Sequence, residues 1–296
     1  MPKILNIGSV NIDFVYSVPH FVRPGETLAS TALEIFPGGK GMNQSVALAR
    51  AGAKVFHAGR IGSDGAAMAK VLEDAGVDTR YLARDAAATG NAIIQVDEQG
   101  QNCIILFAGA NGQLEEEKLE AAIGQFAPGD WLLMQNETNG AARLMTYAHE
   151  KGLRVAYNPS PITPALAGYP LHLVDLFFVN EVEGQALTGE SQEDSILQKM
   201  RALYPKAAIV LTLGGDGAAC ALPDGTVLRQ PVYPAVAVDT TAAGDTFTGY
   251  FLTAYAAGED AALALKMAAR ASSLAVAKMG AAESIPSKEA VLSAGL

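Results

Sequence analysis

Hydrophobic and polar positions alternate with two different periods along most of this chain of 296 residues. Short apolar runs that end in polar residues or glycine predict buried strands, and apolar residues spaced three or four positions apart predict helices. The predicted strands cover residues 3–9, 54–62, 130–136, 154–160, 175–181 and 207–215, and the predicted helices cover 43–52, 66–76, 140–152 and 192–205. This alternation is typical of an α/β fold, a mostly parallel sheet with helices on both faces.

Polar residues stand at the ends of these predicted strands. They are Asn11, Asp13, Asn136, Glu137, Asn158, Asn180 and Gly214. Ligands of such sheets bind beyond the carboxyl ends of the strands, so we expect these residues to gather around one site.

Four further runs predict strands that have no helices between them. They cover residues 13–21, 27–36, 90–98 and 101–109, and the last two flank a hairpin turn at 97–101. We therefore expect a single α/β domain over residues 1–296, with a small separate sheet inserted at about 13–36 and 89–108. A sheet attached in this way would lie over the ligand end as a lid.

Composition excludes several classes of protein. Hydrophobic residues make up 50% of the chain and charged residues 18%, as in a compact folded protein. The net charge of −10 argues against non-specific binding to nucleic acid or to anionic membranes. The two cysteines, Cys103 and Cys220, lie far apart in sequence and neither belongs to a CxxC motif, which argues against a zinc cluster or a disulfide framework. The N-terminus has no signal-peptide pattern and no window approaches 18 apolar residues, so we expect a cytoplasmic protein.

The stretch DTTAAGD, residues 239–245, carries the strongest chemical signal. Asp245 begins an apolar helix, and one interpretation is that it only caps that helix. The small side chains of TAAG leave backbone amides open at the positive end of the helix, where they would form an anion hole. A carboxylate beside an anion hole suits phosphoryl transfer, because the acceptor hydroxyl needs a base and the transferred group needs its charge stabilised.

A second glycine cluster, FPGGKGMNQS at residues 36–45, also precedes a helix. It matches neither the P-loop nor the GxGxxG pattern. It could be a tight turn with a solvated Lys40. Alternatively, the bare backbone at Gly38, Gly39 and Gly41 would let a flat polar ligand such as a polyol approach, with Asn43 as donor and acceptor.

Together these motifs resemble those of the ribokinase, or PfkB, family of carbohydrate kinases. The similarity runs over nearly the whole chain, through GSVNIDF, PGGKGMNQSVALARAG, MQNE, VNEVE, TLGGDG and VDTTAAGDTFTGYF. It implies a ribokinase-like three-layer sandwich with a β-sheet lid. It also implies ATP-dependent phosphorylation of a sugar hydroxymethyl group, with Mg²⁺ and a monovalent cation such as K⁺.

The resemblance assigns roles to single positions. Asp245 matches the catalytic base, and the amides around Ala242, Ala243 and Gly244 match the anion hole. The positions implied for the sugar are Asn11, Asp13, Gly39, Lys40, Asn43, Glu137 and Asp245.

The nucleotide and the cations are implied at other positions. Asn180 and Glu183 match an NxxE element that orders magnesium through water. Thr212, Gly214, Gly217 and Gly244 match the ATP side, although TLGGDG could also be only a strand and a turn. The monovalent cation is implied at Asp239, Thr241, Lys278, Gly280 and Ser284, with several ligands from backbone.

The substrate remains open between alternatives. Residues 25–30 contain no lysine or arginine, which favours an unphosphorylated sugar over a sugar phosphate. Within that class, the resemblance implies ribose, converted to ribose 5-phosphate. Met42 stands where the family usually has alanine, and Thr241 and Thr248 occupy positions that vary in the family, so another small sugar or a nucleoside is the alternative. A catalytically silent sugar-binding protein is a third.

The small sheet is expected to have an apolar face that a sugar alone cannot cover. We assign to it the following residues: Val15, Leu33, Ile35, Ile93, Ile104 and Leu106. Exposed sheet faces and edges are commonly covered by pairing, and ribokinases pair their lids, so a homodimer through the lids is expected.

Overall fold

The computed structural model describes residues 1–85 and 88–295, which form a nine-stranded main sheet and a four-stranded small sheet. The main sheet has the order β5, β4, β1, β8, β9, β10, β11, β12, β13, and is parallel except at β12 and β13. Its strands are β1 (Lys3–Ile7), β4 (Lys54–Ile61), β5 (Asp78–Arg84), β8 (Trp131–Gln135), β9 (Arg154–Asn158), β10 (Leu176–Asn180), β11 (Ala208–Thr212), β12 (Ala218–Ala221) and β13 (Val227–Gln230).

Helices cover both faces of the main sheet. Its central strands are almost wholly buried, which fits runs of apolar residues in a sheet that is covered twice. One core contains side chains of α1 (Lys40–Arg50), α2 (Ala66–Asp74), α7 (Ala243–Ala256), α8 (Ala261–Ala275) and α9 (Lys288–Ser293). The other contains side chains of α3 (Glu116–Ile123), α4 (Ala141–Glu150), α5 (Glu181–Thr188) and α6 (Glu193–Leu203). The predicted three-layer α/β fold is thus confirmed.

None of the helices in the described part of the chain has both the length and the apolar character needed to cross a bilayer.

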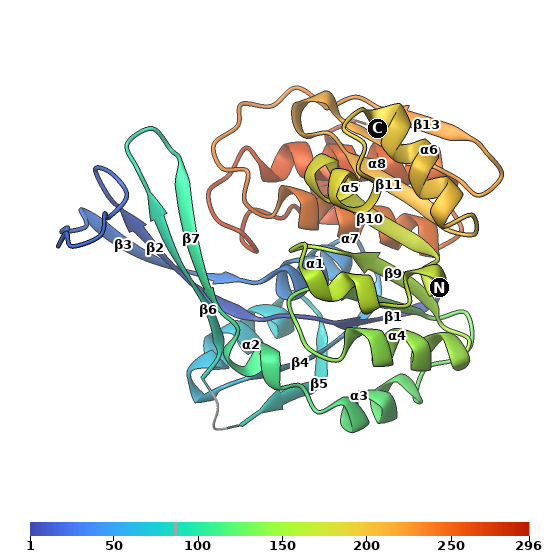
Figure 1. Ribbon diagram of the computed structural model, residues 1–296, viewed down its shortest axis with the longest axis horizontal. Coiled ribbons are helices and arrows are strands. Elements are labelled where there is room, and N and C mark those ends of the chain that lie inside the picture. The colour runs from blue at the N-terminus through green and yellow to red at the C-terminus, as the bar shows by residue number, and fades with distance from the viewer. Residues whose placement is uncertain (86–87, 296) are drawn as a thin grey trace.

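The small sheet stands apart from the main sheet, and Figure 1 shows it projecting from one side of the molecule. Its order is β3, β2, β6, β7, and only the β2–β6 pair is parallel. Its strands are β2 (Asn11–Ser17), β3 (Ala32–Gly38), β6 (Gly90–Val96) and β7 (Asn102–Phe107).

The first two of these strands differ from the predicted ranges 13–21 and 27–36. Residues 18–31 form a connection outside the sheet, closed where the Thr31 amide donates to the Ser17 carbonyl at 2.9 Å. Pro19 and Pro24 lie in this connection and have no N–H to donate to a ladder, which explains the early end of β2. The predicted turn at 97–101 is present, with Gly100 at φ 74°.

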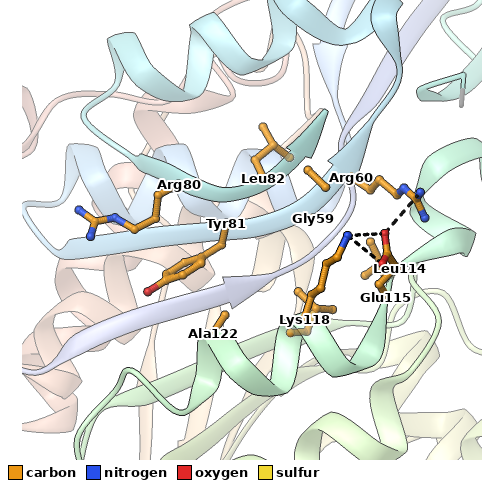
Figure 2. Close-up of a pocket in the computed structure, with 11 residues that line it drawn as sticks. Gly59, Arg60, Arg80, Tyr81, Leu82, Leu114, Glu115, Lys118 and Ala122 are labelled. Carbon is orange, nitrogen blue, oxygen red and sulfur yellow. Dashed lines mark hydrogen bonds and ion pairs between the residues drawn. The ribbon is translucent and has the colours of Figure 1, made fainter. Parts of the chain in front are cut away.

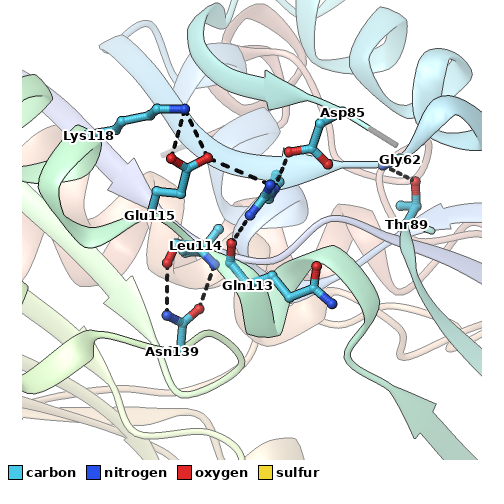
Figure 3. Close-up of polar contacts among 9 residues, drawn as sticks. Gly62, Asp85, Thr89, Gln113, Leu114, Glu115, Lys118 and Asn139 are labelled. Atoms are coloured by element: carbon cyan, nitrogen blue, oxygen red, sulfur yellow. Dashed lines mark hydrogen bonds and ion pairs between the residues drawn. The ribbon is translucent and has the colours of Figure 1, made fainter. Parts of the chain in front are cut away.

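Side-chain hydrogen bonds hold the base of the small sheet against the main domain (Figure 3). Before β6, the hydroxyl of Thr89 accepts from the Gly62 amide at 3.0 Å. After β7, Asn139 pairs with both the N–H and the C=O of Leu114, at 2.8 and 3.0 Å. The chain is therefore fixed where it enters β6 and again after it leaves β7.

Candidate active site

The centre of the candidate site lies where the strand order reverses. Strand β1 pairs with β4 on one side and with β8 on the other, and such a switch point opens a crevice at the carboxyl ends of the strands. Glu137 follows β8 at this crevice, and the hydroxyl of Ser9, which follows β1, donates to its carboxylate. The backbone amide of Lys40 donates to the same carboxylate oxygen at 3.1 Å.

A cavity of about 600 Å³, here called the sheet cavity, lies between the small sheet and these strand ends. Every residue that the sequence assigned to the sugar lines it: Asn11, Asp13, Gly39, Lys40, Asn43, Glu137 and Asp245. The wall on the small sheet is largely apolar, with Val15, Phe36 and Ile94 among its residues. The cavity therefore combines a polar floor with an apolar roof, as sites for small polar molecules commonly do.

Burial raises the pKa values of two carboxyl groups in this cavity, and for one of them repulsion by the other adds to the effect. Burial raises the pKa of Asp13 to about 7, and the negative charge of Glu137 adds to that effect. Burial also raises the pKa of Glu137, although the charge of Lys40 opposes the change. A Cβ at position 38 would collide with the carboxylate of Asp13, so a larger residue there would displace that carboxylate.

The charge of Lys40 is retained in spite of burial. Burial alone lowers the pKa of Lys40, but nearby carboxylates, led by Asp245 and Glu137, more than offset it and leave the pKa above its ordinary value. Lys40 is therefore not the solvated turn lysine of the alternative interpretation. It is a cation held at the boundary between the sheet cavity and a second cavity.

Two helices meet at the site and bring its two sequence motifs together. A Cβ at Gly249 in α7 would collide with Ala47 in α1, so these helices pack backbone against side chain. Asp245 is the third residue of α7, and its carboxylate accepts hydrogen bonds from Asn43 at 3.1 Å and Gln44 at 2.9 Å. The interpretation of Asp245 as the helix cap is wrong, because the cap position is Ala242 and no side chain caps this helix.

The start of α7 leaves donors open. Ala242 has φ 59°, the one non-glycine residue with positive φ in the described part of the chain. The amide of Ala243 donates to the Thr240 carbonyl at 3.2 Å, whereas those of Gly244 and Asp245 have no acceptor among the described residues. Unpaired amides at a helix N-terminus attract anions. A strained residue at this place is typical of a functional loop.

A second cavity of about 260 Å³, here called the junction cavity, adjoins the sheet cavity. Asn180 and Glu183 line it and form a capping box at the start of α5: Asn180 accepts from the Glu183 amide at 2.9 Å, and Glu183 accepts from the Asn180 amide at 2.9 Å. Thr212 and Gly244 line it as well. The NxxE pair is thus rigid and faces the open amides of α7.

A third cavity of about 440 Å³, here called the loop cavity, continues from the junction cavity. Thr212, Gly214, Gly217 and Gly244 line it, as the sequence indicated for a nucleotide. TLGGDG is also a strand followed by a turn into β12, so both interpretations of this motif describe the same structure. Residues 232–235 and parts of α8 complete the walls, and sequence analysis missed them because apolar contacts leave no motif.

The residues proposed for a monovalent cation are only partly gathered. Asp239 accepts from the Thr241 amide at 2.9 Å and from the Gly280 amide at 3.0 Å, which ties two loops together. Asp239, Thr241 and Gly280 line the sheet cavity. In the described structure, Lys278 and Ser284 do not line it, and the Ser284 hydroxyl donates to the Ala281 carbonyl at 2.9 Å.

A further hollow of about 210 Å³ lies elsewhere, between β4, β5 and α3 (Figure 2). Its cations are already paired: Lys118 with Glu115 at 2.8 Å, Arg80 with Asp78 at 2.7 Å, and Arg60 with Asp85. It contains none of the predicted site residues. The three connected cavities are therefore the better candidate for a site.

Comparison with known protein families identifies the family of this chain. Residues 1–288 match the pfkB family of carbohydrate kinases. The chain belongs to this family. It is an ATP-dependent carbohydrate kinase, as the motifs indicated.

Similar proteins extend over almost the whole chain. The ribokinase of Haemophilus influenzae is 37% identical over 302 residues, covering 99% of this chain and 98% of that protein. The structure of ribokinase from Cryptococcus neoformans in complex with ADP has a TM-score of 0.87 and 35% identity, covering 99% of this chain and all of that one. The structure of Arabidopsis thaliana ribokinase complexed with ribose and ATP has a TM-score of 0.87 and 29% identity, covering 99% and 98%.

Proposed function

We propose that this kinase transfers the γ-phosphoryl group of ATP to the terminal hydroxymethyl of an unphosphorylated sugar, D-ribose, giving ribose 5-phosphate. The observation that carries the proposal is the position of Asp245. It is the one carboxylate in the described structure that lines both the sheet cavity and the junction cavity. A base at that boundary can reach a hydroxyl on one side and a phosphoryl group on the other.

The reaction follows from this arrangement. Asp245 accepts the proton of the sugar hydroxyl as its oxygen bonds to the γ-phosphorus, and the bond from that phosphorus to the bridging oxygen of ADP breaks. The open amides of Gly244 and Asp245 stabilise the charge on the transferred group. Lys40, which also lines both cavities, adds positive charge at their boundary.

The sheet cavity supports the sugar assignment. Asp13 and Glu137 can each accept hydroxyl protons, and the buried Oδ1 of Asn43 has no partner among the described residues and can accept another. Glu34 is the charged residue that the small sheet adds to the cavity besides Asp13, and it would repel a phosphorylated sugar. The alternative substrates are another small sugar or a nucleoside, and the silent binding protein is the least favoured.

The residues around the junction cavity fit magnesium. No group of three acidic, cysteine or histidine side chains able to hold a metal occurs in the described structure, which suits an ion coordinated mainly by water and phosphates. Glu183 would hold such water, and Asn180 orients Glu183 through the capping box. When bound, magnesium supplies positive charge to the phosphate oxygens.

We also propose a K⁺ site at Asp239, a lid role for the small sheet within one domain, and a homodimer. The two loops tied by Asp239 include the start of the open-amide turn, so a cation there would order that turn. Because ATP is a cytoplasmic co-substrate, we place the reaction in the cytoplasm.

Two experiments test this function. The first measures ATP turnover with free pentoses, hexoses, nucleosides and sugar phosphates; we expect the highest kcat/KM with ribose, and no turnover with any of them would favour the silent protein. The second compares Asp245→Asn with the wild type. We expect kcat to fall by about 10² to 10⁴ with sugar affinity largely kept, since a general base contributes that much. A variant with near-normal kcat would refute the role of Asp245.

A further inference from the structure

A chain of buried amide side chains supports Asp245 from behind. Gln44, on α1, is fully buried and donates from Nε2 to Oδ1 of Asp245 at 2.9 Å and to Oδ1 of Asn158 at 3.3 Å. Its own Oε1 accepts from Nε2 of Gln135 at 2.7 Å. Both amide protons and the carbonyl oxygen of Gln44 are therefore engaged, which leaves its side chain a single orientation.

The chain continues into the core on one side and toward the NxxE element on the other. Gln135 also donates to Asn6 at 2.9 Å, and Asn6 donates to Ser45 at 2.8 Å. In the other direction, Asn158 donates to the Phe178 carbonyl at 2.9 Å. These hydrogen bonds restrict the side chains that make them, because breaking one leaves a buried polar group without a partner; in the described structure, Oε1 of Gln135 is the atom of this side chain that has no partner.

We propose that Gln44 is a positioning residue for the base, a role that rests on the proposed function of Asp245. Asn43 binds Oδ2 and Gln44 binds Oδ1, so α1 fixes the rotation of a carboxylate that belongs to α7. Asp245 itself lines both the sheet cavity and the junction cavity. Gln44 lines neither the sheet cavity nor the junction cavity in the described structure, so it acts on the reaction through Asp245 and not through substrate.

The test is a double-mutant cycle on kcat. Gln44→Met keeps the length of the side chain and removes its hydrogen bonds. We expect kcat to fall about 10- to 100-fold, the scale of losses caused by small misplacements of a reacting group, while the dissociation constant of ribose changes less than about three-fold. In an Asp245→Asn background, measured in single turnover, the same change should lower the rate less than about three-fold, because its target is already gone.

Thr253→Val is the matched control. Thr253 is buried on the same helix as Asp245 and donates to the Gly249 carbonyl at 2.7 Å, far along α7 from the base. Its loss should lower the melting temperature to a similar extent as Gln44→Met and leave kcat unchanged. Asn43→Ala gives the contrast, because Asn43 lines the sheet cavity and its loss should weaken ribose binding as well as kcat.

The outcomes separate this inference from the function on which it rests. If Asp245→Asn keeps near-normal kcat, the proposed function fails. If Asp245→Asn is impaired but Gln44→Met behaves like Thr253→Val, or if the two losses multiply in the double mutant, Gln44 has only a structural role. Should Gln44→Met fail to fold, Gln135→Met replaces it: we expect a smaller loss of kcat with the same lack of additivity, and an unchanged kcat would overturn the inference.

Discussion

Asp13 is expected to make sugar binding weaker at pH 6 than at pH 8. The pKa of its carboxyl is about 7, raised by burial and by the charge of Glu137. An ionised carboxylate can accept two hydroxyl protons, whereas the protonated acid loses much of that capacity. If the sugar binds the ionised form, the apparent dissociation constant is the intrinsic one multiplied by 1 + 10^(pKa−pH). That factor is about 11 at pH 6 and about 1.1 at pH 8, so affinity should rise about ten-fold between them.

Calorimetric titration with ribose in the absence of ATP measures this effect without any contribution from the chemical step. At pH 7, about half of the Asp13 carboxyls are protonated, so binding should release about half a proton. Titrations in two buffers with different heats of ionisation give that number directly. Protonation of Asp13 at the lower pH should not unfold the protein. Because the pKa of this carboxyl is raised in the folded state, the folded state binds the proton more tightly than the unfolded state does. The residue therefore adds stability at low pH, and that contribution is lost as the pH rises through 7.

Two variants show whether Asp13 is the source of the pH dependence of ribose binding. Asp13→Asn should bind ribose more weakly and lose the pH dependence between 6 and 8. Glu137→Gln removes the neighbouring negative charge, so it should shift the midpoint to lower pH. A wild-type affinity that is flat across this range, or a pH dependence that survives in Asp13→Asn, would refute the reasoning.

The other predictions concern the cation and the dimer. Activity should rise with K⁺, and Asp239→Ala should blunt the response because it unties the loop that starts at Thr241; equal rates with and without K⁺ would remove the cation site. Light scattering should give a dimer, and Ile104→Glu should weaken both the dimer and ribose binding, since Ile104 is about half exposed and lines a cavity larger than one pentose fills. Ile105→Glu on the opposite face is the control that should leave ribose binding intact, and a monomeric wild type with full activity would contradict the dimer.

In the small sheet, the strands could be predicted from the sequence, but the face that each side chain occupies could not. Strand periodicity marks alternate residues, and both faces of this sheet carry apolar residues. The six residues assigned to one apolar face in fact divide: Val15, Ile104 and Leu106 line the sheet cavity, whereas the register places Leu33, Ile35 and Ile93 on the other face. That assignment was wrong because a hydrophobic pattern does not say which of two apolar faces meets the main domain.

The main sheet was predicted in its central strands and missed at both of its ends. β5, with sequence DTRYLAR, lies at one end of the sheet, and its charged residues hide the strand signal. The antiparallel β12 and β13 at the other end were also missed, since four residues are too few for a pattern to stand out. In the site, motif resemblance pointed to Asn43 and Asp245, whereas Gln44 was overlooked because burial, and not residue type, reveals its role.

The contact between Gly249 and Ala47 bears on how this enzyme can diverge during evolution. No larger residue fits at position 249 without separating α1 from α7, and that separation would move Asn43 and Gln44 away from Asp245. The chemistry of transfer is therefore tied to one interhelical distance and has little freedom to drift. The apolar side chains that cover the sheet cavity are not constrained in this way, because they come from the half-exposed small sheet. New sugar preferences can accumulate there by single substitutions while the catalytic centre remains as it is.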